Sequence, residues 1–499
     1  MSGTHSTPVR GLMSTKASPL FEGRFGRMFR AVRPATFGAT DAENATNLAA
    51  LGAAMAAEFE EPEDGKDDEE SGIPALYTYL GQFIDHDITF DPASSLQKQN
   101  DPDALVDFRT PALDLDNVYG RGPDDQPYLY DGSNAFLLGD PISGGGLPAK
   151  DLPRNAAIPR RALIGDPRND ENTIVSQLHG LFLRFHNRML ADHPGVTFGD
   201  IQRLVRFHYQ YVVLHDFLPR IVHSSVVNDL KTATRYDASK LRFFRWRYNP
   251  FIPVEFSAAA YRLGHSMVRP GYRLNDAVLQ PIFPVPPQFP EGLTGFRAMN
   301  PDWGIDWGRF IDIDVRAYDG SPAVQQKRLQ LAYRLDTSLV HPLANLPPAV
   351  ASHPASLAER NLLRGWRLGL PSGQDVARAM GITPLADRDI LIGQGVDAPD
   401  EPLKKIRDVS AVFANNCPLW TYILAEAMHF GESVKIPVTE DVTINTPRLG
   451  PVGGRIVAEV LLGLIAGDRN SLLSLNPGWH PPGGARFALK DFVKYALGG

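Results

Sequence analysis

The chain has 499 residues, a formal net charge of −7 and a hydrophobic content of 43%. These values describe a globular protein with ample material for a core, and they exclude disorder over most of the chain. The pI near 6.0 gives no basic footprint, so we expect neither nucleic acid nor a membrane as a partner. The single cysteine, Cys417, excludes an intramolecular disulfide, which leaves packing, a metal or a cofactor to stabilise the fold.

The N-terminus lacks the apolar core of a secretory leader, because Arg10, Lys16 and Glu22 are scattered among polar residues. The most apolar long stretch, residues 456–467, contains Glu459 and is too short to cross a bilayer, so we interpret it as a buried helix. With one cysteine and no visible leader, the chain is expected to be cytoplasmic. Export by a route that needs no leader stays open.

Helical periodicity dominates the chain and predicts a mainly α fold with little β structure. Apolar residues recur at a spacing of three to four over residues 73–87 and 172–190. Further helical patterns cover 199–231, 255–268, 323–334, 373–380, 418–429 and 453–468. Residues 90–160 are too rich in Pro, Gly and Asp for regular structure. The acidic run at 60–72, EEPEDGKDDEESG, predicts a solvated loop.

The helix predicted at 73–87 ends in the sequence GQFIDHD. Gln82, Asp85 and His86 stand at i, i+3 and i+4, so the three side chains share one helix face. Asp87 lies about 100° further round the helix and serves a different environment. The alternative is that these residues form an exposed, charged helix end.

A second motif, TPALDLD at residues 110–116, spaces oxygen donors at alternate positions, as in a loop that wraps a hard cation. Asp87 could complete this set of donors. Carboxylate, hydroxyl and carbonyl oxygens without a thiolate favour calcium over zinc. Alternating aspartates are also common in ordinary turns, which is the alternative interpretation.

Two further segments carry polar groups in unusual places. In DPRNDE, residues 166–171, Arg168 and Glu171 are three apart and could face one cavity; the dipole of the following helix explains the acids but not Arg168. In YRLGHSMV, residues 261–268, His265 follows a glycine that permits a close approach to the backbone. A satisfied core histidine is the alternative there. Asn361 offers an amide that could fix the tautomer of this imidazole, as metal-ligating histidines require.

Taken in order, these segments resemble the animal haem peroxidase superfamily over roughly residues 75–470. GQFIDHD is similar to its distal-histidine helix, TPALDLDNVYG to its calcium loop, GDPRNDEN to its catalytic-arginine segment and YRLGH to its proximal-histidine helix. RNLLRGWRLGLPSGQ resembles the segment with the asparagine partner of the proximal histidine, and NNCPLWTYILAEA and LGPVGGRIVAEVLLGLI resemble its C-terminal helices. The resemblance implies a bacterial-type member with a catalytic domain at 73–480, an N-terminal extension at 1–72 and a C-terminal tail at 481–499. Its haem would lie between a distal and a proximal helix, among long irregular loops.

The resemblance implies a role for each residue of the haem site. His86 would be the distal histidine, Arg168 its catalytic partner and Gln82 a neighbour of small-anion substrates. His265 would be the axial iron ligand, with Asn361 as the acceptor for its imidazole. The haem-contacting residues would also include Arg262, Asp85 and Glu171, of which the last two align with carboxylates that form ester bonds to haem in mammalian members. Competence for the esters is implied, but not their formation. Asn172 stands where a methionine links to haem in myeloperoxidase, so that bond cannot form.

The resemblance also implies a calcium site. Its ligands would be Asp87, Thr110, the carbonyl of Ala112, Asp114 and Asp116. Asp116 replaces the serine that is usual in the family, and the extra carboxylate should tighten the site.

These assignments predict an enzyme, a peroxidase with haem b and Ca²⁺ as cofactors and no obligate protein partner. It would reduce hydrogen peroxide and oxidise a halide, thiocyanate or a small phenolic donor. His86 would take a proton from peroxide and return it to the departing oxygen, and Arg168 would stabilise the charge that develops as the O–O bond breaks.

Two alternatives stand beside this prediction. The first is a fatty-acid dioxygenase that resembles cyclooxygenase and uses a tyrosine three residues before the proximal histidine. This chain has Arg262 at that position and Tyr261 one residue further away. The second is a non-catalytic haem-binding or calcium-binding protein, against which the presence of both His86 and Arg168 argues.

Overall fold

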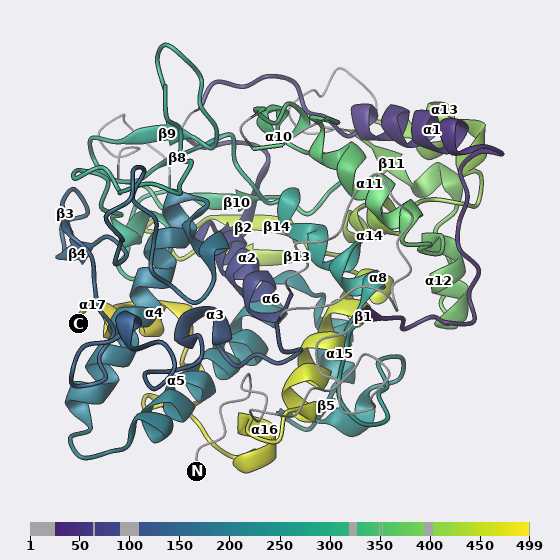
Figure 1. Ribbon diagram of the computed structural model, residues 1–499. Helices are drawn as coiled ribbons and strands as arrows, with labels where there is room; N and C mark the ends of the chain where they lie inside the picture. The colour runs from purple at the N-terminus through teal and green to yellow at the C-terminus, as the bar shows by residue number, and fades with distance from the viewer. Residues whose placement is uncertain are drawn as a thin grey trace.

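The computed structural model describes residues 25–62, 65–89, 109–318, 327–348, 350–351, 353–393 and 403–498. Helices make up most of the regular structure, and the strands in this part of the chain pair only two by two (Figure 1). The predicted mainly α class with little β structure is therefore confirmed.

The helices are α1 (Asp41–Ala54), α2 (Leu76–Ile88), α3 (Asp116–Tyr119), α4 (Thr173–Asp192), α5 (Phe198–Val212), α6 (Leu218–Ile221), α7 (Ser224–Asp229), α8 (Val254–Ser257), α10 (His341–Ala344), α11 (Leu357–Arg367), α12 (Gly373–Ala379), α13 (Ile406–Val409), α14 (Leu419–Ala427), α15 (Pro451–Gly467), α16 (Leu472–Leu475) and α17 (Leu489–Leu497). The strand pairs are β1 (Phe25–Gly26) with β7 (Ile252–Pro253), β2 (Glu70–Pro74) with β10 (Leu331–Tyr333), β3 (Pro141–Ile142) with β4 (Ala149–Lys150), β5 (Lys231–Thr232) with β6 (Arg235–Tyr236), β8 (Gly271–Arg273) with β9 (Leu279–Pro281), β11 (Leu391–Ile392) with β12 (Lys404–Lys405), and β13 (Gly431–Lys435) with β14 (Thr443–Pro447).

Five predicted helices are confirmed as α2, α4, α12, α14 and α15, with ends that differ by a few residues. α2 packs against α4, and α4 packs in turn against α5 and α17. α15 is buried along most of its length, since it carries apolar residues on every face. The interpretation of residues 456–467 as a buried helix is thus confirmed. Among the described residues, no helix combines the length and the apolar character needed to span a bilayer.

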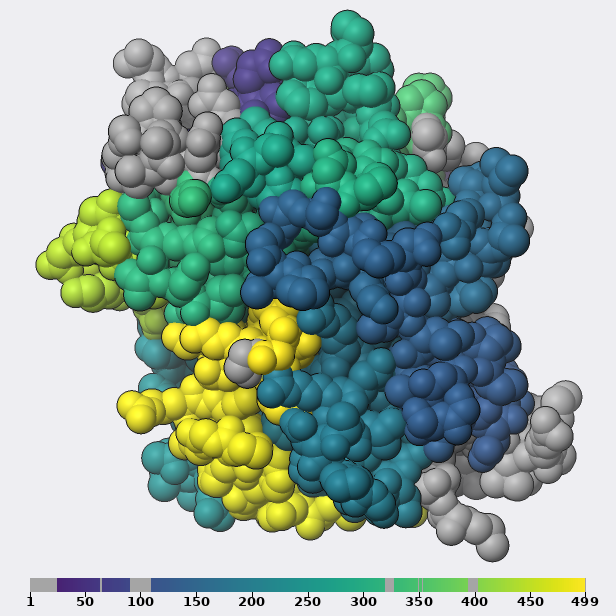
Figure 2. Space-filling view, turned by 90° about the vertical axis from the view of Figure 1, so that its left-hand side faces the viewer, coloured from purple at the N-terminus to yellow at the C-terminus, as the bar shows by residue number. Residues whose placement is uncertain are grey.

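Both ends of the described chain pack against the rest of the fold. α17 lies along α4, where the ring of Phe492 stacks on that of Phe185 with 3.9 Å between centroids. In Figure 2 the C-terminal residues, in yellow, lie against segments coloured blue and teal. α1 packs against α11, and Leu48 and Phe492 belong to one apolar core. Residues from the predicted extension and tail thus share the core of the predicted catalytic domain, whose boundaries stay a prediction.

The acidic run at 60–72 is a solvated loop only in its first part, where Glu61, Lys66 and Asp68 are exposed and belong to no helix or strand. Residues 63–64 lie outside the described part of the chain, but residues 69–72 are buried and β2 begins at Glu70. The Glu70 carboxylate lies 2.7 Å from Arg269 Nη1 and 2.8 Å from Arg328 Nη1, and none of the three side chains is more than 2% exposed. A buried charge requires such partners. The local composition does not reveal them, because both arginines are far away in sequence.

Three other predicted helices need correction. The segment 199–231 contains α5, a π-helical turn at Val213–Phe217, α6 and α7. In the segment 323–334, residues 323–326 lie outside the described part and residues 331–333 form β10, which pairs with β2. The segment 255–268 holds the end of α8 and a 3-10 turn at Ala260–His265. There Arg262 Nε donates to the Ser257 carbonyl at 2.9 Å, which occupies an oxygen that a continuous α-helix would pair with the N–H of residue 261.

A buried carboxylate that contacts the start of α15 should make the stability of the protein depend on pH. Glu426 Oε2 accepts the N–H groups of Val452 and Gly453 at 3.0 Å, but burial raises the pKa of Glu426 to about 7 despite these bonds. A carboxyl pKa that is raised on folding favours the folded state at low pH, and this advantage is lost as the pH rises from about 4.3 through 7. We therefore expect the difference in melting temperature between Glu426→Gln and the wild type (variant minus wild type) to be more positive at pH 8 than at pH 5. A difference that does not change with pH in scanning fluorimetry would contradict this.

Candidate functional site

A cavity of about 620 Å³ is lined by residues of α2, of the turn Ala260–His265 and of the segment before α4. Its volume lies within the range of about 300–1,000 Å³ that is typical of ligand and cofactor pockets. Much of its wall is apolar, with Phe217, Leu263, Met267, Val268, Ile282, Phe283, Pro284, Leu343, Leu346 and Leu357. An apolar wall with a few polar groups is the usual composition of such pockets.

Among the residues of α2 that line the cavity are Gln82, Asp85 and His86, which share one helix face, as their spacing predicts. Gln82 and His86 approach Glu171, whose Oε1 lies 2.5 Å from Gln82 Nε2 and 3.4 Å from His86 Nε2. Burial raises the pKa of Glu171, but its contacts with His86, Arg168 and Gln82 outweigh burial and leave that pKa below its ordinary value. His86 Nε2 and the Glu171 carboxylate therefore stand side by side at the cavity wall.

Arg168 is absent from the described residues that line the cavity. Its guanidinium Nη2 lies 2.8 Å from Asp166 Oδ2 and donates to the carbonyl oxygens of His86 at 3.1 Å and Thr89 at 2.5 Å. Asp166 is fully buried and also binds Arg109 at 2.6 Å. Burial raises the pKa of Asp166, but the two arginines hold it well below its ordinary range. Arg168 is thus fixed behind His86, at the C-terminal end of α2.

His265 lines the cavity from the end of the 3-10 turn. Its Nδ1 lies 2.8 Å from the Asn361 amide on α11, and rotation of that amide would bring its oxygen to this position as an acceptor. This contact leaves Nε2 of His265 for a ligand. Burial, together with the charge of Arg262, lowers the pKa of His265 to about 3, so the imidazole is neutral. Arg262 and Gly264 also line the cavity, and a Cβ added at Gly264 would meet nothing within 4 Å.

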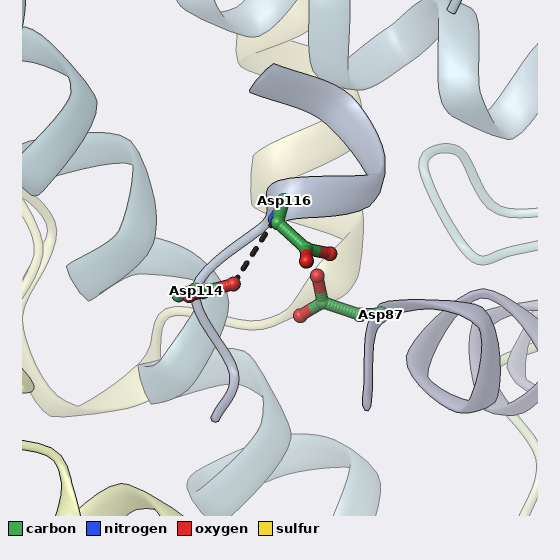
Figure 3. A group of neighbouring side chains, drawn as sticks. All are labelled: Asp87, Asp114 and Asp116. Atoms are coloured by element: carbon green, nitrogen blue, oxygen red, sulfur yellow. Dashed lines mark hydrogen bonds between the residues drawn. The ribbon is translucent and has the colours of Figure 1, made fainter. Parts of the chain in front are cut away.

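Asp87 belongs to a separate acidic cluster with Asp114 and Asp116 (Figure 3). All three are buried, and each offers a carboxylate oxygen within 4.8 Å of the others. Between the latter two, Leu115 has a φ of 60° and donates its N–H to Asp87 Oδ2 at 3.3 Å. Asp87 Oδ1 is buried and has no hydrogen-bond partner among the described residues.

The electrostatics of this cluster favour a cation. Burial and the charge of Asp114 raise the pKa values of Asp87 and Asp116 well above the ordinary range. Arg109 contacts Asp116 at 3.2 Å and offsets part of the negative charge. Two further residues of the predicted loop are near: Thr110 Oγ1 donates to Asp114 Oδ2 at 2.7 Å, and Ala112 is buried in the same loop. The donors are all oxygens, which is the set that calcium prefers.

Sequence reasoning missed four residues that support these groups: Asp166, Arg109, Asn169 and His179. One signal was present for Asp166, because the charge of Arg168 at the start of a helix was unexplained and an acid stands two residues before it. Asn169 and His179 stand behind His86, and Arg109 joins Asp116 to Asp166. These contacts depend on tertiary packing, which no local pattern reveals.

A family model described as animal haem peroxidase matches residues 95–409, more than half of the chain. Arg168, His265 and Asn361 lie within that range, and α2 precedes it. The chain is 28% identical over 232 residues to thyroid peroxidase of Homo sapiens and 25% identical over 240 residues to peroxidasin of Drosophila melanogaster. These matches cover 45% and 46% of the chain but only 23% and 14% of the two relatives, so the chain spans part of them.

Solved structures share the fold over nearly the whole chain. Peroxidase A of Dictyostelium discoideum aligns with a TM-score of 0.60 over 96% of this chain and 94% of that protein, at 16% identity. A fatty acid alpha-dioxygenase of Arabidopsis thaliana aligns with a TM-score of 0.56 over 95% and 77%, at 12% identity. At these identities the likeness is one of fold alone.

Proposed function

The chain belongs to the animal haem peroxidase family, and from this premise we propose that it is a peroxidase that reduces hydrogen peroxide and oxidises a halide, thiocyanate or a small phenolic donor. The observation that carries the proposal is a single cavity lined by both His86 and His265, with Asn361 on Nδ1 of His265. Family membership implies haem as the cofactor.

The residues of the cavity fit a haem. The neutral imidazole of His265 would hold the iron through Nε2, the open backbone at Gly264 admits a large flat group, and the apolar wall would contact the macrocycle. Asp85 and Glu171 both line the cavity and would be the partners for ester bonds to haem b. Asn361 would fix the imidazole tautomer and increase its basicity toward the metal.

When bound, the haem supplies the redox chemistry, and the protein supplies binding and proton transfer. His86 Nε2 takes a proton from hydrogen peroxide in the cavity and returns it to the departing oxygen, which leaves as water. Gln82 holds the Glu171 carboxylate at 2.5 Å beside His86. Arg168, fixed by Asp166, provides a positive charge behind His86. This charge stabilises the negative charge that develops as the O–O bond breaks.

We also propose that the acidic cluster binds Ca²⁺ through Asp87, Thr110, the Ala112 carbonyl, Asp114 and Asp116. Three buried carboxylates repel one another, as the raised pKa values of Asp87 and Asp116 reflect, and a divalent cation relieves that repulsion. The buried, unpaired Oδ1 of Asp87 supports the same assignment. Asp87 follows His86 directly, so a cation there would also hold the end of α2.

Calcium is therefore expected to stabilise the protein. When free Ca²⁺ is at 100 times its Kd and binds only the folded state, it adds about 2.7 kcal/mol to the free energy of unfolding. The melting temperature should therefore fall when the protein is transferred from Ca²⁺ to EGTA. Asp114→Asn should lose this response, whereas the exposed Asp441→Asn should keep it. Equal melting temperatures of the wild type in Ca²⁺ and in EGTA would refute the site.

The function itself is tested by an absorption spectrum of the purified protein, followed by a peroxide titration and acid–acetone extraction. The proposal predicts a Soret band that shifts with peroxide, and turnover of a phenolic donor. Haem that resists extraction would support the ester bonds to Asp85 and Glu171. Protein made with adequate haem and calcium but without a Soret band would refute the proposal. A Soret band without peroxide turnover would favour a non-catalytic haem-binding protein.

One observation supports a fatty-acid dioxygenase as the second candidate. Tyr261 lines the cavity, and its buried hydroxyl has no hydrogen-bond partner among the described residues. A tyrosyl radical there could oxidise an apolar substrate. Incubation with a fatty acid and oxygen distinguishes the candidates, since a lipid hydroperoxide that disappears in Tyr261→Phe would favour the dioxygenase. We favour the peroxidase, because Arg262 occupies the position three residues before His265.

The cellular location is part of the same proposal. We propose a cytoplasmic protein, supported by the single, buried cysteine. Fractionation of the native host tests this, and recovery of the protein outside the cytoplasm would contradict it.

A further inference from the structure

Asn169 and His179 form a buried row on the Nδ1 side of His86, whereas Glu171 lies on its Nε2 side. Asn169 Oδ1 lies 2.8 Å from His86 Nδ1, and Asn169 Nδ2 lies 2.9 Å from Nδ1 of His179 on α4. Asn169 and His179 are fully buried, and His86 is 5% exposed. Neither the proposed haem contacts nor the proposed calcium ligands include Asn169 or His179.

The hydrogen-bond chemistry of this row links the proton positions of the two histidines. When the amide oxygen faces His86, it accepts that residue's Nδ1–H, and Nδ2 donates to His179, whose proton then stands on Nε2. If the amide were reversed, Asn169 would donate to His86 Nδ1, and the His86 proton would stand on Nε2. Only the first arrangement leaves the Nε2 lone pair of a neutral His86 on the cavity side.

His179 has features that packing alone does not explain. Its Nε2 is buried without a hydrogen-bond partner among the described residues, which is unfavourable for folding. Burial lowers the pKa of His179 to about 3, so it stays neutral and offers Asn169 one acceptor. Its ring packs on Phe83, with 6.1 Å between centroids. An apolar residue would fill this place without leaving a buried polar atom unpaired, so the presence of a histidine requires an explanation other than packing.

We propose that Asn169, anchored by His179, is a positioning residue that holds His86 in the tautomer with its proton on Nδ1 and its Nε2 lone pair in the cavity. This inference rests on the proposed peroxidase function, in which that lone pair receives the first proton of hydrogen peroxide. A histidine in the other tautomer presents an N–H to the substrate and cannot act as the base.

Two substitutions with side chains of nearly equal size distinguish the effect of the hydrogen bonds from the effect of packing. Asn169→Leu removes both hydrogen bonds, whereas Asn169→Asp keeps an acceptor for His86, and His179 can donate to it in its other tautomer. Asn169→Leu should lower kcat/KM for hydrogen peroxide by about 10–100-fold, the usual effect of losing an outer partner of a functional histidine. Its haem content and its rate constant for donor oxidation should stay unchanged. Asn169→Asp should recover most of the loss.

Two further variants serve as controls. His179→Phe should cause a smaller loss, and its addition to Asn169→Leu should cause no further loss, because the two residues act as a unit. Asn187 lies on the same helix as His179, and its amide also makes two hydrogen bonds, both to the backbone of Phe136. Asn187→Leu should therefore keep the wild-type kcat/KM for hydrogen peroxide. Additive losses, or an equal loss in Asn187→Leu, would assign the effect to packing and overturn the inference.

A direct measurement is ¹⁵N NMR of labelled histidines in the diamagnetic ferrous carbon monoxide complex. The wild type should show the His86 proton on Nδ1, and Asn169→Leu should show a mixture of tautomers. If His86→Ala abolishes peroxide reduction but Asn169→Leu does not, or if the wild-type proton stands on Nε2, the inference fails and the proposed function survives. If His86→Ala leaves peroxide reduction unchanged, the proposed function itself fails.

Discussion

Protein carrying His265→Ala, produced with ample haem, is expected to show no stable Soret band. His265 offers the cavity a neutral imidazole whose Nδ1 is already engaged by Asn361. Loss of the outer partner of a metal ligand costs about 10–100-fold in affinity, and loss of the ligand itself should cost more.

The measurement is the haem-to-protein absorbance ratio after gel filtration. His208→Gln is the matched control, because His208 is also buried, bonds to a carbonyl through Nδ1 and does not line the cavity. Asn361→Leu should lie between the wild type and His265→Ala. A normal Soret band in His265→Ala would exclude this residue as the axial ligand.

His86→Ala is expected to keep its haem but to react with hydrogen peroxide about 10²–10⁴ times more slowly, the contribution of a positioned general base. His86 Nε2 stands at the cavity wall beside Glu171, and no other described histidine except His265 lines the cavity. Stopped-flow spectroscopy of the Soret band with increasing peroxide gives the rate constant directly. Gln82→Leu, which removes a neighbour without removing the base, should have a smaller effect. An unchanged rate constant in His86→Ala would defeat the assigned role.

Much of this site could be predicted because it depends on local spacing. The periodicity of α2 places Gln82, Asp85 and His86 on one face and Asp87 on another. In the structure the first three line the cavity, and Asp87 belongs to the acidic cluster. The long helix α4 likewise begins at the predicted residues, where Asn172 caps its first turn. Such features require only neighbours within a few residues of one another.

The features that could not be predicted depend on partners far away in the sequence. Glu70 looks like part of a solvated acidic run until Arg269 and Arg328 are placed beside it. Residues 331–333 form a strand only because β2 lies next to them. In each case a tertiary contact outweighs the local pattern.

The ion pairs of Glu70 also constrain the order in which the molecule can fold. Glu70 lies at the start of β2, a few residues before the helix that carries His86, yet its partners follow it by 199 and 258 residues along the chain. Contacts of such separation are slow to form, and during synthesis the ribosome delivers the acid long before either base. Glu70, in the strand that leads into α2, therefore has no ion-pair partner until Arg269 has emerged, and it gains its second arginine only with Arg328. A nascent chain that stops before Arg269 keeps an unmatched acid a few residues before the helix that carries His86.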